Sequence, residues 1–174
     1  MASSNRSALN AFCVPGGYIY VYTGLIDYLD EQDQLAGVLG HEMAHADQRH
    51  STQQLTESYG IQTIASFLLG KQGGLVGEIA SAVIGLNFSR ADEAEADEYS
   101  VRYLCETDYA ANGAAGFFEK LLAEGSDTQI PEFLSTHPSS DTRVADINAL
   151  ADDLGCSIEP NPDVNYQDLK DALK

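Results

Sequence analysis

One five-residue stretch constrains this chain more than any other feature of the sequence. It places His41 and His45 four positions apart, with Glu42 directly after the first histidine. On a helix, residues four apart lie on one face, one turn apart, so both imidazoles can reach the same metal ion. Glu42 is rotated by about 100° from His41, so its carboxylate flanks the metal. The pattern predicts a zinc site with two histidine ligands and a general base beside a bound water.

Length and composition limit what can surround this stretch. The 174 residues predict a single domain over 1–174, with a core over about 8–154 and a C-terminal tail over 155–174. The formal net charge of −18 argues against nucleic acid and anionic lipid as partners. No apolar run reaches the roughly 18–20 residues that a membrane-spanning helix needs. We therefore expect a globular protein without a transmembrane segment.

The N-terminus and the cysteines bear on the compartment. No apolar stretch follows residues 1–6, so these residues are not a signal peptide. The chain is expected to be either intracellular or a portion from which an export signal has been removed. Cys13 is expected to be a small buried hydrophobe. Cys105 and Cys156 lie near the ends of expected helices and can pair if the compartment is oxidising.

Two extended segments are expected at the start of the fold. Residues 10–14 precede a turn at residues 15–17. The run after the turn alternates aromatic and β-branched side chains, as strands do: Tyr18, Ile19, Tyr20, Val21 and Tyr22. A hairpin or a bent edge strand follows. It either only covers the helices or adds an extended polypeptide substrate as a further strand.

Helices are expected over most of the remaining chain. Asp30 is the expected N-cap of a helix from about residue 31 to 55, in which Gly37 and Gly40 allow another backbone to pack close. Further helices are expected over 61–69, 75–86, 89–105, 114–122 and 140–154. Residues 131–138 are expected to be extended or irregular because two prolines bracket them. The fold class is therefore α+β and mostly α, with a small edge sheet packed on the histidine-bearing helix.

A third protein ligand is needed, because catalytic zinc usually takes three and leaves one position open. The acidic helix places Glu93 and Asp97 on one face, whereas Glu95 faces away. Acidic residues on a helix usually face solvent. Glu93 and Asp97 are therefore candidates only because the histidine pair requires a partner. We expect Glu93 to be the third ligand and Asp97 to accept the N–H of a ligating histidine.

The developing oxyanion needs a donor besides the metal. His137 lies in a loop-like segment and Arg143 six residues later, and both are candidates. Three roles for His137 stay open: contact with the oxyanion or substrate, direct ligation that occupies the water position, or a structural role. Arg49 and His50 are expected to be packing or ion-pair residues rather than ligands.

Three functional hypotheses follow from these residues. In the first, the chain is a zinc-dependent endopeptidase with one zinc ion, in which Glu42 takes a proton from the zinc-activated water and returns it to the leaving amine. In the second, it is a catalytically silent zinc module that binds unfolded polypeptide in a chaperone-like role. In the third, it is a latent protease blocked by His137.

The order of several motifs resembles one known family. The motifs are Asn10-Ala11-Phe12 with Pro15-Gly16-Gly17, Thr23-Gly24-Leu25, the histidine pair, Ser89-Arg90 with Glu93 and Ala96-Asp97, and Ser135-Thr136-His137-Pro138 with Arg143. Together they resemble the HExxH zinc metallopeptidases that include the HtpX heat-shock protease and the CAAX prenyl endopeptidases, peptidase family M48. The similarity covers about residues 8–150 and is greatest to the soluble periplasmic BepA-like and LoiP-like branch.

The resemblance implies a minigluzincin-like fold and zinc on the residues that match His41, His45 and Glu93, with Glu42 as base. It also implies that Asp97 is the family's aspartate that contacts a ligating histidine, and it places His137 close to the metal. The function implied is cleavage of misfolded or misassembled cell-envelope proteins. The location implied is periplasmic or outer-membrane-associated, with an export signal or lipid anchor ahead of the sequence given.

Overall fold

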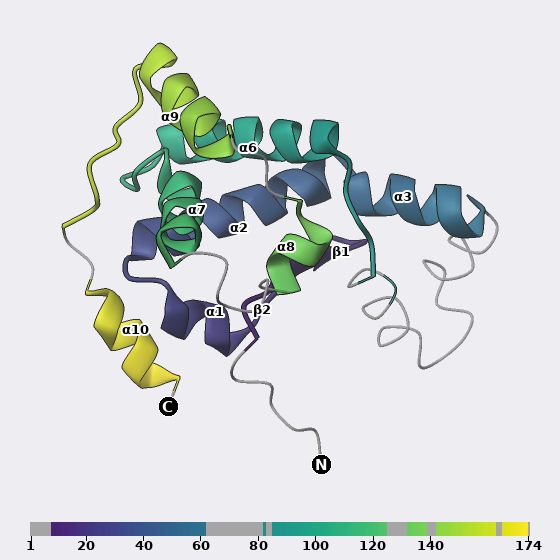
Figure 1. The fold of residues 1–174 in the computed structure, drawn as a ribbon, viewed down its shortest axis with the longest axis horizontal. Helices are drawn as coiled ribbons and strands as arrows, with labels where there is room; N and C mark the ends of the chain where they lie inside the picture. Colours follow the sequence, from purple (N-terminus) through teal and green to yellow (C-terminus); the bar gives the residue numbers. More distant parts are fainter. Residues whose placement is uncertain are drawn as a thin grey trace.

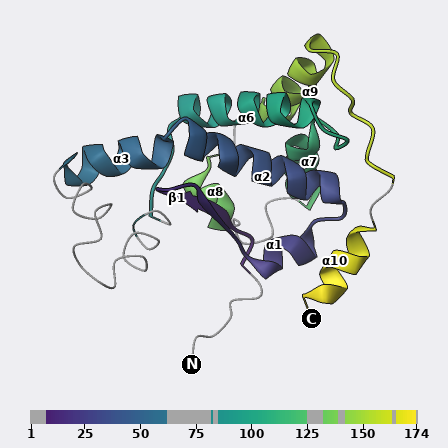
Figure 2. The same cartoon turned by 180° about the vertical axis from the view of Figure 1, so that it is seen from behind.

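The histidine pair lies on the central helix of the molecule. The computed structural model describes residues 8–61, 82, 85–124, 132–138, 142–162 and 165–173. Helix α2 (Gln32–Asp47) carries the pair and packs against α6 (Arg90–Cys105) and α7 (Gly113–Glu124). Figures 1 and 2 show α6 running alongside α2, with the small sheet on the other side of α2. The mostly helical α+β class is therefore confirmed.

The expected hairpin is present. Strands β1 (Ala11–Val14) and β2 (Tyr18–Val21) pair antiparallel, with Cys13 opposite Ile19. Gly16 and Gly17 turn the chain with φ values of 105° and 82°, which glycine adopts without steric cost. All of β1 is buried and contacts α2, whereas β2 exposes its two tyrosines. The sheet thus packs on the histidine-bearing helix, as expected.

The expected long helix over 31–55 begins within one residue of its expected start but is wrong at its C-terminal end. A short helix, α1 (Thr23–Tyr28), comes first, and the N-cap of α2 is Glu31 rather than Asp30. The Gln34 side chain accepts hydrogen bonds from the backbone N–H groups of Asp30 and Glu31. A glutamine at the third helical position often caps in this way.

A break at Gln48 and Arg49 separates α2 from α3 (His50–Tyr59). Arg49 has φ of 63° and is the one non-glycine residue of the described ranges with positive φ. A left-handed residue directly after the C-cap is a common way to end a helix, although it costs a side-chain-bearing residue roughly 1–2 kcal/mol. The sequence carries no glycine here to mark the break.

Helices α2 and α7 touch backbone to backbone. A Cβ atom on Gly37 would overlap the backbone of Ala114, and a Cβ on Gly113 would overlap the carbonyl group of Asp33. The Ser100 hydroxyl of α6 donates to the Gly37 carbonyl at 2.9 Å. The expectation that Gly37 allows a close approach is confirmed.

The second half of the chain completes the core. Helix α8 (Glu132–Thr136) replaces the irregular segment expected between two prolines, because a proline restricts only the residue directly before it. Helix α9 (Arg143–Asp153) follows. Both contribute to the main hydrophobic core, through Phe133 and Ile147. The expected helix at 114–122 is confirmed as α7, and that at 89–105 as α6, whose N-cap is Ser89.

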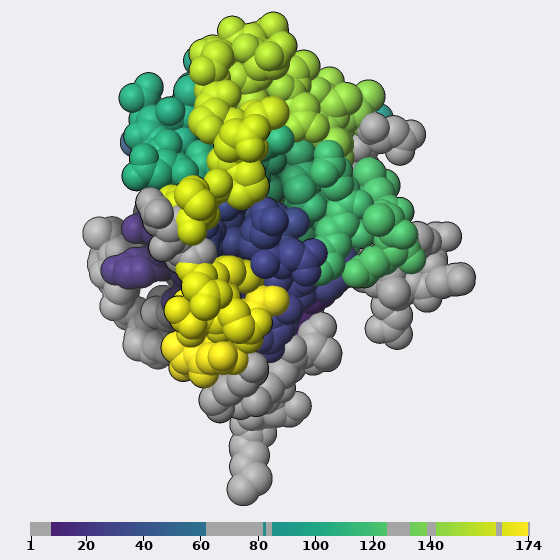
Figure 3. Space-filling view, turned by 90° about the vertical axis from the view of Figure 1, so that its left-hand side faces the viewer, coloured from purple at the N-terminus to yellow at the C-terminus, as the bar shows by residue number. Residues whose placement is uncertain are grey.

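The C-terminal tail is anchored and partly helical. Helix α10 (Tyr166–Ala172) buries Tyr166, whose hydroxyl donates to the carbonyl of Ile26 at 2.8 Å. The pairing of Cys105 with Cys156, which the sequence left open, is present as a disulfide. Figure 3 shows the yellow C-terminal segment lying across one face of the molecule, next to the blue N-terminal part of the chain.

Two expected features fall largely outside this description. The helices expected over 61–69 and 75–86 lie almost wholly in the ranges that are not described. Among the described helices, none is both long enough and apolar enough to cross a membrane.

Candidate metal centre

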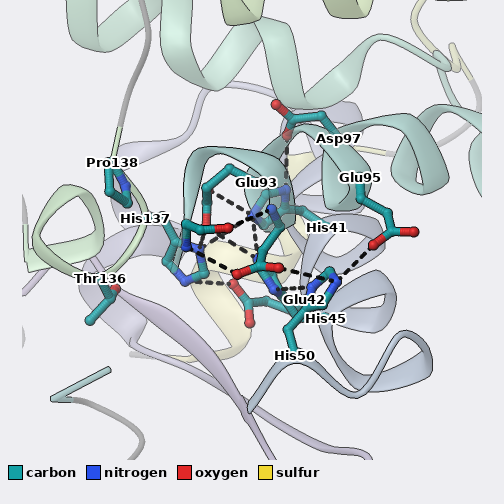
Figure 4. Close-up of polar contacts among 12 residues, drawn as sticks. His41, Glu42, His45, His50, Glu93, Glu95, Asp97, Thr136, His137 and Pro138 are labelled. Atoms are coloured by element: carbon teal, nitrogen blue, oxygen red, sulfur yellow. Dashed lines mark hydrogen bonds and ion pairs between the residues drawn. The ribbon is translucent and has the colours of Figure 1, made fainter. Parts of the chain in front are cut away.

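Four buried side chains from three parts of the chain converge on one point. His41 and His45 come from α2, Glu93 from the first turn of α6, and His137 from the residue after α8. One ligand atom of each lies within 4.8 Å of one ligand atom of every other, and Figure 4 shows the four side chains pointing toward one another. All four are at least 98% buried. The cluster could hold a metal ion.

The separations of the donor atoms fit a tetrahedral zinc site. Nε2 of His41 lies 3.0 Å from Nε2 of His45, and Glu93 oxygens lie 3.5 Å and 3.4 Å from these two atoms. Zinc bonds to nitrogen and oxygen of about 2.0–2.1 Å imply donor separations of roughly 3.3 Å in a tetrahedron. The donor set of imidazole and carboxylate is also the one that catalytic zinc takes. The residues present therefore fit the ion.

The ring of His41 is oriented by a contact of its Nδ1 atom, on the side away from the cluster. Nδ1 of His41 lies 2.9 Å from Oδ1 of Asp97, so its Nε2 faces the cluster. Arg143 in turn donates from Nε and Nη2 to the two Asp97 oxygens at 2.7 Å each, and from Nη1 to Glu93 at 2.8 Å. Bidentate pairing of this kind fixes direction as well as charge. The guanidinium of Arg143 thus lies behind the two acids, stacked over the ring of Phe118.

Burial and hydrogen bonds set the charge of this cluster. Burial alone would raise the pKa values of Glu93 and Asp97, but hydrogen bonds from the histidines and Arg143 hold both below their usual range. Burial would lower the pKa of His41, but its bonds to Asp97 and Glu93 outweigh this and raise it to about 9. Burial lowers the pKa of His45 and favours the neutral imidazole that a metal requires.

Glu42 lies beside the cluster, with Oε1 3.3 Å from Nε2 of His137. It is 1% exposed, and neither carboxylate oxygen has a hydrogen-bond partner among the described residues. Burial raises its pKa. A buried carboxylate without a hydrogen bond is costly unless water or a metal ion satisfies it. The carboxylate can accept and carry a proton in this position.

His137 lies deeper in the site than a loop residue that only touches substrate. Its Nδ1 is 2.9 Å from Glu93 and 3.3 Å from Nε2 of His41, while its Nε2 is 3.3 Å from Glu42. The ring stacks on Phe133 with centroids 4.4 Å apart. His137 therefore stands between the predicted ligands and the predicted base.

The strand next to the base is β1. Strand β1 packs against α2. Burial, together with the charge of Glu42, raises the pKa of Cys13 on this strand. The residues expected to bind substrate lie on or just after β2, where Tyr18 and Tyr20 are exposed and Ile19, Val21 and Tyr22 are half-buried. Their role stays a prediction.

One pair of residues near the site was not predicted to belong to it. His50 is buried, with Nδ1 only 2.9 Å from Nδ1 of His45 and Nε2 3.0 Å from Oε2 of Glu95. Glu95 does face away from the cluster, as expected, but toward His50. The sequence does not mark the break between α2 and α3. In a continuous helix His50 would point away from His45.

Comparison with known proteins agrees with this geometry. Residues 1–151 match the family described as Peptidase family M48. The chain belongs to peptidase family M48. The expected family is thus confirmed, and with it the metallopeptidase class.

Several relatives share the greater part of this chain. It is 34% identical over 140 residues to "Mitochondrial metalloendopeptidase OMA1" of Arabidopsis thaliana, covering 80% of this chain and 29% of the relative. It is 30% identical over 178 residues to "Beta-barrel assembly-enhancing protease" of Yersinia pestis, covering 94% and 36%. It is 32% identical over 149 residues to "Metalloprotease YcaL" of Escherichia coli, covering 81% and 58%. The chain therefore spans between 29% and 58% of the length of these relatives.

Proposed function

We propose that this chain is a zinc-dependent endopeptidase that hydrolyses peptide bonds of misfolded or misassembled cell-envelope proteins. The observation that carries the proposal is the convergence of His41, His45 and Glu93, with donor atoms 3.0–3.5 Å apart, beside the unpartnered carboxylate of Glu42. Family membership supports the same chemistry.

One zinc ion would be held by His41, His45 and Glu93, with Asp97 fixing the tautomer of His41. Bound zinc supplies Lewis acidity, which polarises a carbonyl group and lowers the pKa of water to about 7. Glu42 takes the proton from the attacking water and delivers it to the leaving amine. Its raised pKa suits this role, because a base whose pKa lies nearer neutrality can also act as the acid.

Donors for the oxyanion are the remaining requirement. His137 has its Nε2 without a hydrogen-bond partner among the described residues, and this atom lies on the Glu42 side of the cluster. It is the better placed of the two candidates. Every nitrogen of the Arg143 guanidinium already donates to Asp97 or Glu93, so Arg143 more readily supports these acids than a substrate oxygen.

The substrate is proposed to be an extended polypeptide that adds to the small sheet through residues 18–22. Exposed Tyr18 and Tyr20 offer aromatic surface there. The Cys105–Cys156 disulfide supports an oxidising compartment, and thus a periplasmic or outer-membrane-associated location. Relatives named for β-barrel assembly support the envelope as the source of substrates.

A latent form of the same enzyme is a second candidate. His137 is one of the four converging donors, and four protein ligands would complete a tetrahedral zinc site. In this form the chain retains zinc and binds unfolded polypeptide, while cleavage waits for withdrawal of His137.

Metal content and cleavage measured on the same samples test the proposal. We expect about one zinc per chain by plasma emission in the wild type, a lower content in Glu93→Gln, and casein cleavage that a chelator abolishes. Zinc without cleavage in both the wild type and His137→Ala would overturn the enzymatic proposal. Absence of zinc from the wild type would overturn the metal site itself.

A further inference from the structure

We propose that His50, supported by Glu95, is a positioning residue that fixes the ring of His45 for metal binding. His50 is 3% exposed and places Nδ1 2.9 Å from Nδ1 of His45, with its other nitrogen 3.0 Å from Glu95 (Figure 4). The inference rests on the proposed function, because it concerns how His45 presents Nε2 to zinc.

The positions of the protons give this contact a direction. Nε2 of His45 faces the donor cluster, and a neutral imidazole that ligates through Nε2 carries its proton on Nδ1. Two Nδ1 atoms 2.9 Å apart cannot both carry protons, so His45 donates and His50 accepts. His50 then keeps its proton on Nε2 and donates it to Oε2 of Glu95.

The backbone is shaped to make this contact. Five positions along a continuous helix correspond to about 500° of rotation, so His50 would point about 140° away from His45. The break at Gln48, with Arg49 in the left-handed region, instead returns the first residue of α3 toward the ring. Arg49 thus holds a backbone conformation that is unfavourable for a residue with a side chain. Such strain often occurs where a functional group must be positioned, here His50. Phe88 stacks on the face of the His45 ring at 4.1 Å, which leaves the ring edge to His50.

Each of the two histidines is thus oriented through its Nδ1 atom by an acidic residue of α6, directly or through a second imidazole. Asp97 receives the Nδ1 proton of His41 directly, whereas Glu95 reaches His45 only through the imidazole of His50. Both acids come from α6, two residues apart, and they point to opposite sides. The Glu95 carboxylate is 48% exposed, and Asp92 lies 3.9 Å from the same His50 nitrogen, so this chain of hydrogen bonds ends at the surface.

Three substitutions separate the hydrogen bond from packing. In His50→Asn the amide oxygen lies near the position of Nδ1 and can still accept from His45. In His50→Gln the amide nitrogen lies near the position of Nε2 and keeps only the link to Glu95, and His50→Leu removes both. We expect zinc dissociation constants, from competition with a chromogenic chelator, to rise about 10–100-fold in His50→Leu and His50→Gln and to stay within about threefold of wild type in His50→Asn. The absorption spectrum of the Co²⁺-substituted protein should change in the same order.

The outcomes are unambiguous. A His50→Leu protein that folds and binds zinc as the wild type does would overturn the proposal. Zinc binding by His50→Asn that is as weak as that of His50→Leu would also overturn it. If His50→Leu does not fold, Glu95→Ala is compared with Glu98→Ala, which removes the same charge from an exposed site on the same helix. We expect zinc binding to be weaker in Glu95→Ala than in Glu98→Ala by up to about threefold, since Glu95 acts on His45 only through His50. Equal constants would overturn the proposal. Wild type that binds no zinc would instead overturn the proposed function.

Discussion

Nδ1 of His137 lies 2.9 Å from Oε1 of Glu93, although the two residues are 44 positions apart in the chain. The contact brings His137 into the donor cluster, where it would complete a tetrahedral zinc site and leave no position for water. For the latent form we expect His137→Ala to raise the turnover of an unfolded fluorescent casein substrate while zinc content stays at one per chain.

The opposite outcome is equally informative about His137. If the substitution lowers kcat by about 10²–10³, as loss of an oxyanion donor does, the residue assists the reaction and the latent form is excluded. Thermal unfolding of the two proteins provides the control, because His137 also stacks on Phe133.

Replacement of the base should separate zinc binding from chemistry. Glu42→Gln keeps the size of the side chain but cannot accept the proton, so we expect cleavage to fall about 10²–10⁴-fold. Zinc content and the circular dichroism spectrum should match those of the wild type. Retention of more than a small fraction of the activity would show that another group takes the proton.

Arg143 is expected to matter more for stability than for the reaction. It neutralises Glu93 and Asp97 while 4% exposed, and removing one member of a buried ion pair typically costs about 3–5 kcal/mol. Urea unfolding of chelator-treated Arg143→Ala should show a loss of this size. The exposed pair of Arg102 with Glu98 is the control, because Arg102→Ala should cost less than about 1 kcal/mol. Equal losses in the two variants would contradict the structural role.

The close contact of α2 with α7 predicts a contrast between two glycines. Gly37→Ala would drive a methyl group into the backbone of Ala114, and overpacking of this kind costs about 1–3 kcal/mol or more. Gly116→Ala in α7 meets only the flexible side chain of Gln34, so it should be neutral or gain up to about 1 kcal/mol of helix propensity. Unfolding midpoints measured side by side test the contrast. A tolerated Gly37→Ala would mean that the helices lie further apart.

Cys13 should be unreactive in the folded protein. Burial raises the pKa of its thiol to about 12, so only about one molecule in ten thousand carries the reactive thiolate at pH 8. We expect no alkylation by iodoacetamide in the folded, unreduced protein and one modified cysteine per chain after unfolding, since Cys105 and Cys156 are paired. Mass spectrometry counts the adducts. Rapid alkylation before unfolding would show that the strand opens.

Much of the metal cluster could be predicted from the sequence, because its members are related by the helical repeat. His41 and His45 are one turn apart on α2, and Glu93 and Asp97 are one turn apart on α6. The structure brings these four side chains together in the expected way, although their roles toward a metal stay predictions. The residues alone left the role of His137 open, and only the family resemblance placed it close to the metal, since its position depends on how α8 packs under the site.

The features that sequence reasoning missed have local physical causes. Arg49 lies just after α2 in a left-handed conformation, which glycine or asparagine usually adopts. Because the sequence has neither residue there, it does not predict the break. Helix α8 is a single short segment between prolines, where helix propensity is a weak guide and packing of Phe133 decides. Helix α10 is stabilised by tertiary contacts of Tyr166 that cannot be read from a local pattern.

The disulfide also gives the folded chain a particular topology. Cys105 and Cys156, 51 positions apart, close a covalent loop that contains His137 and Arg143, whereas His41, Glu42, His45 and Glu93 all precede it. In the latent form, a metal ion that also bound His137 would act as a second cross-link, joining the loop to the N-terminal segment. Each cross-link reduces the conformations that the unfolded chain can adopt, so oxidation before metal uptake would shorten the search by which His137 finds its partners.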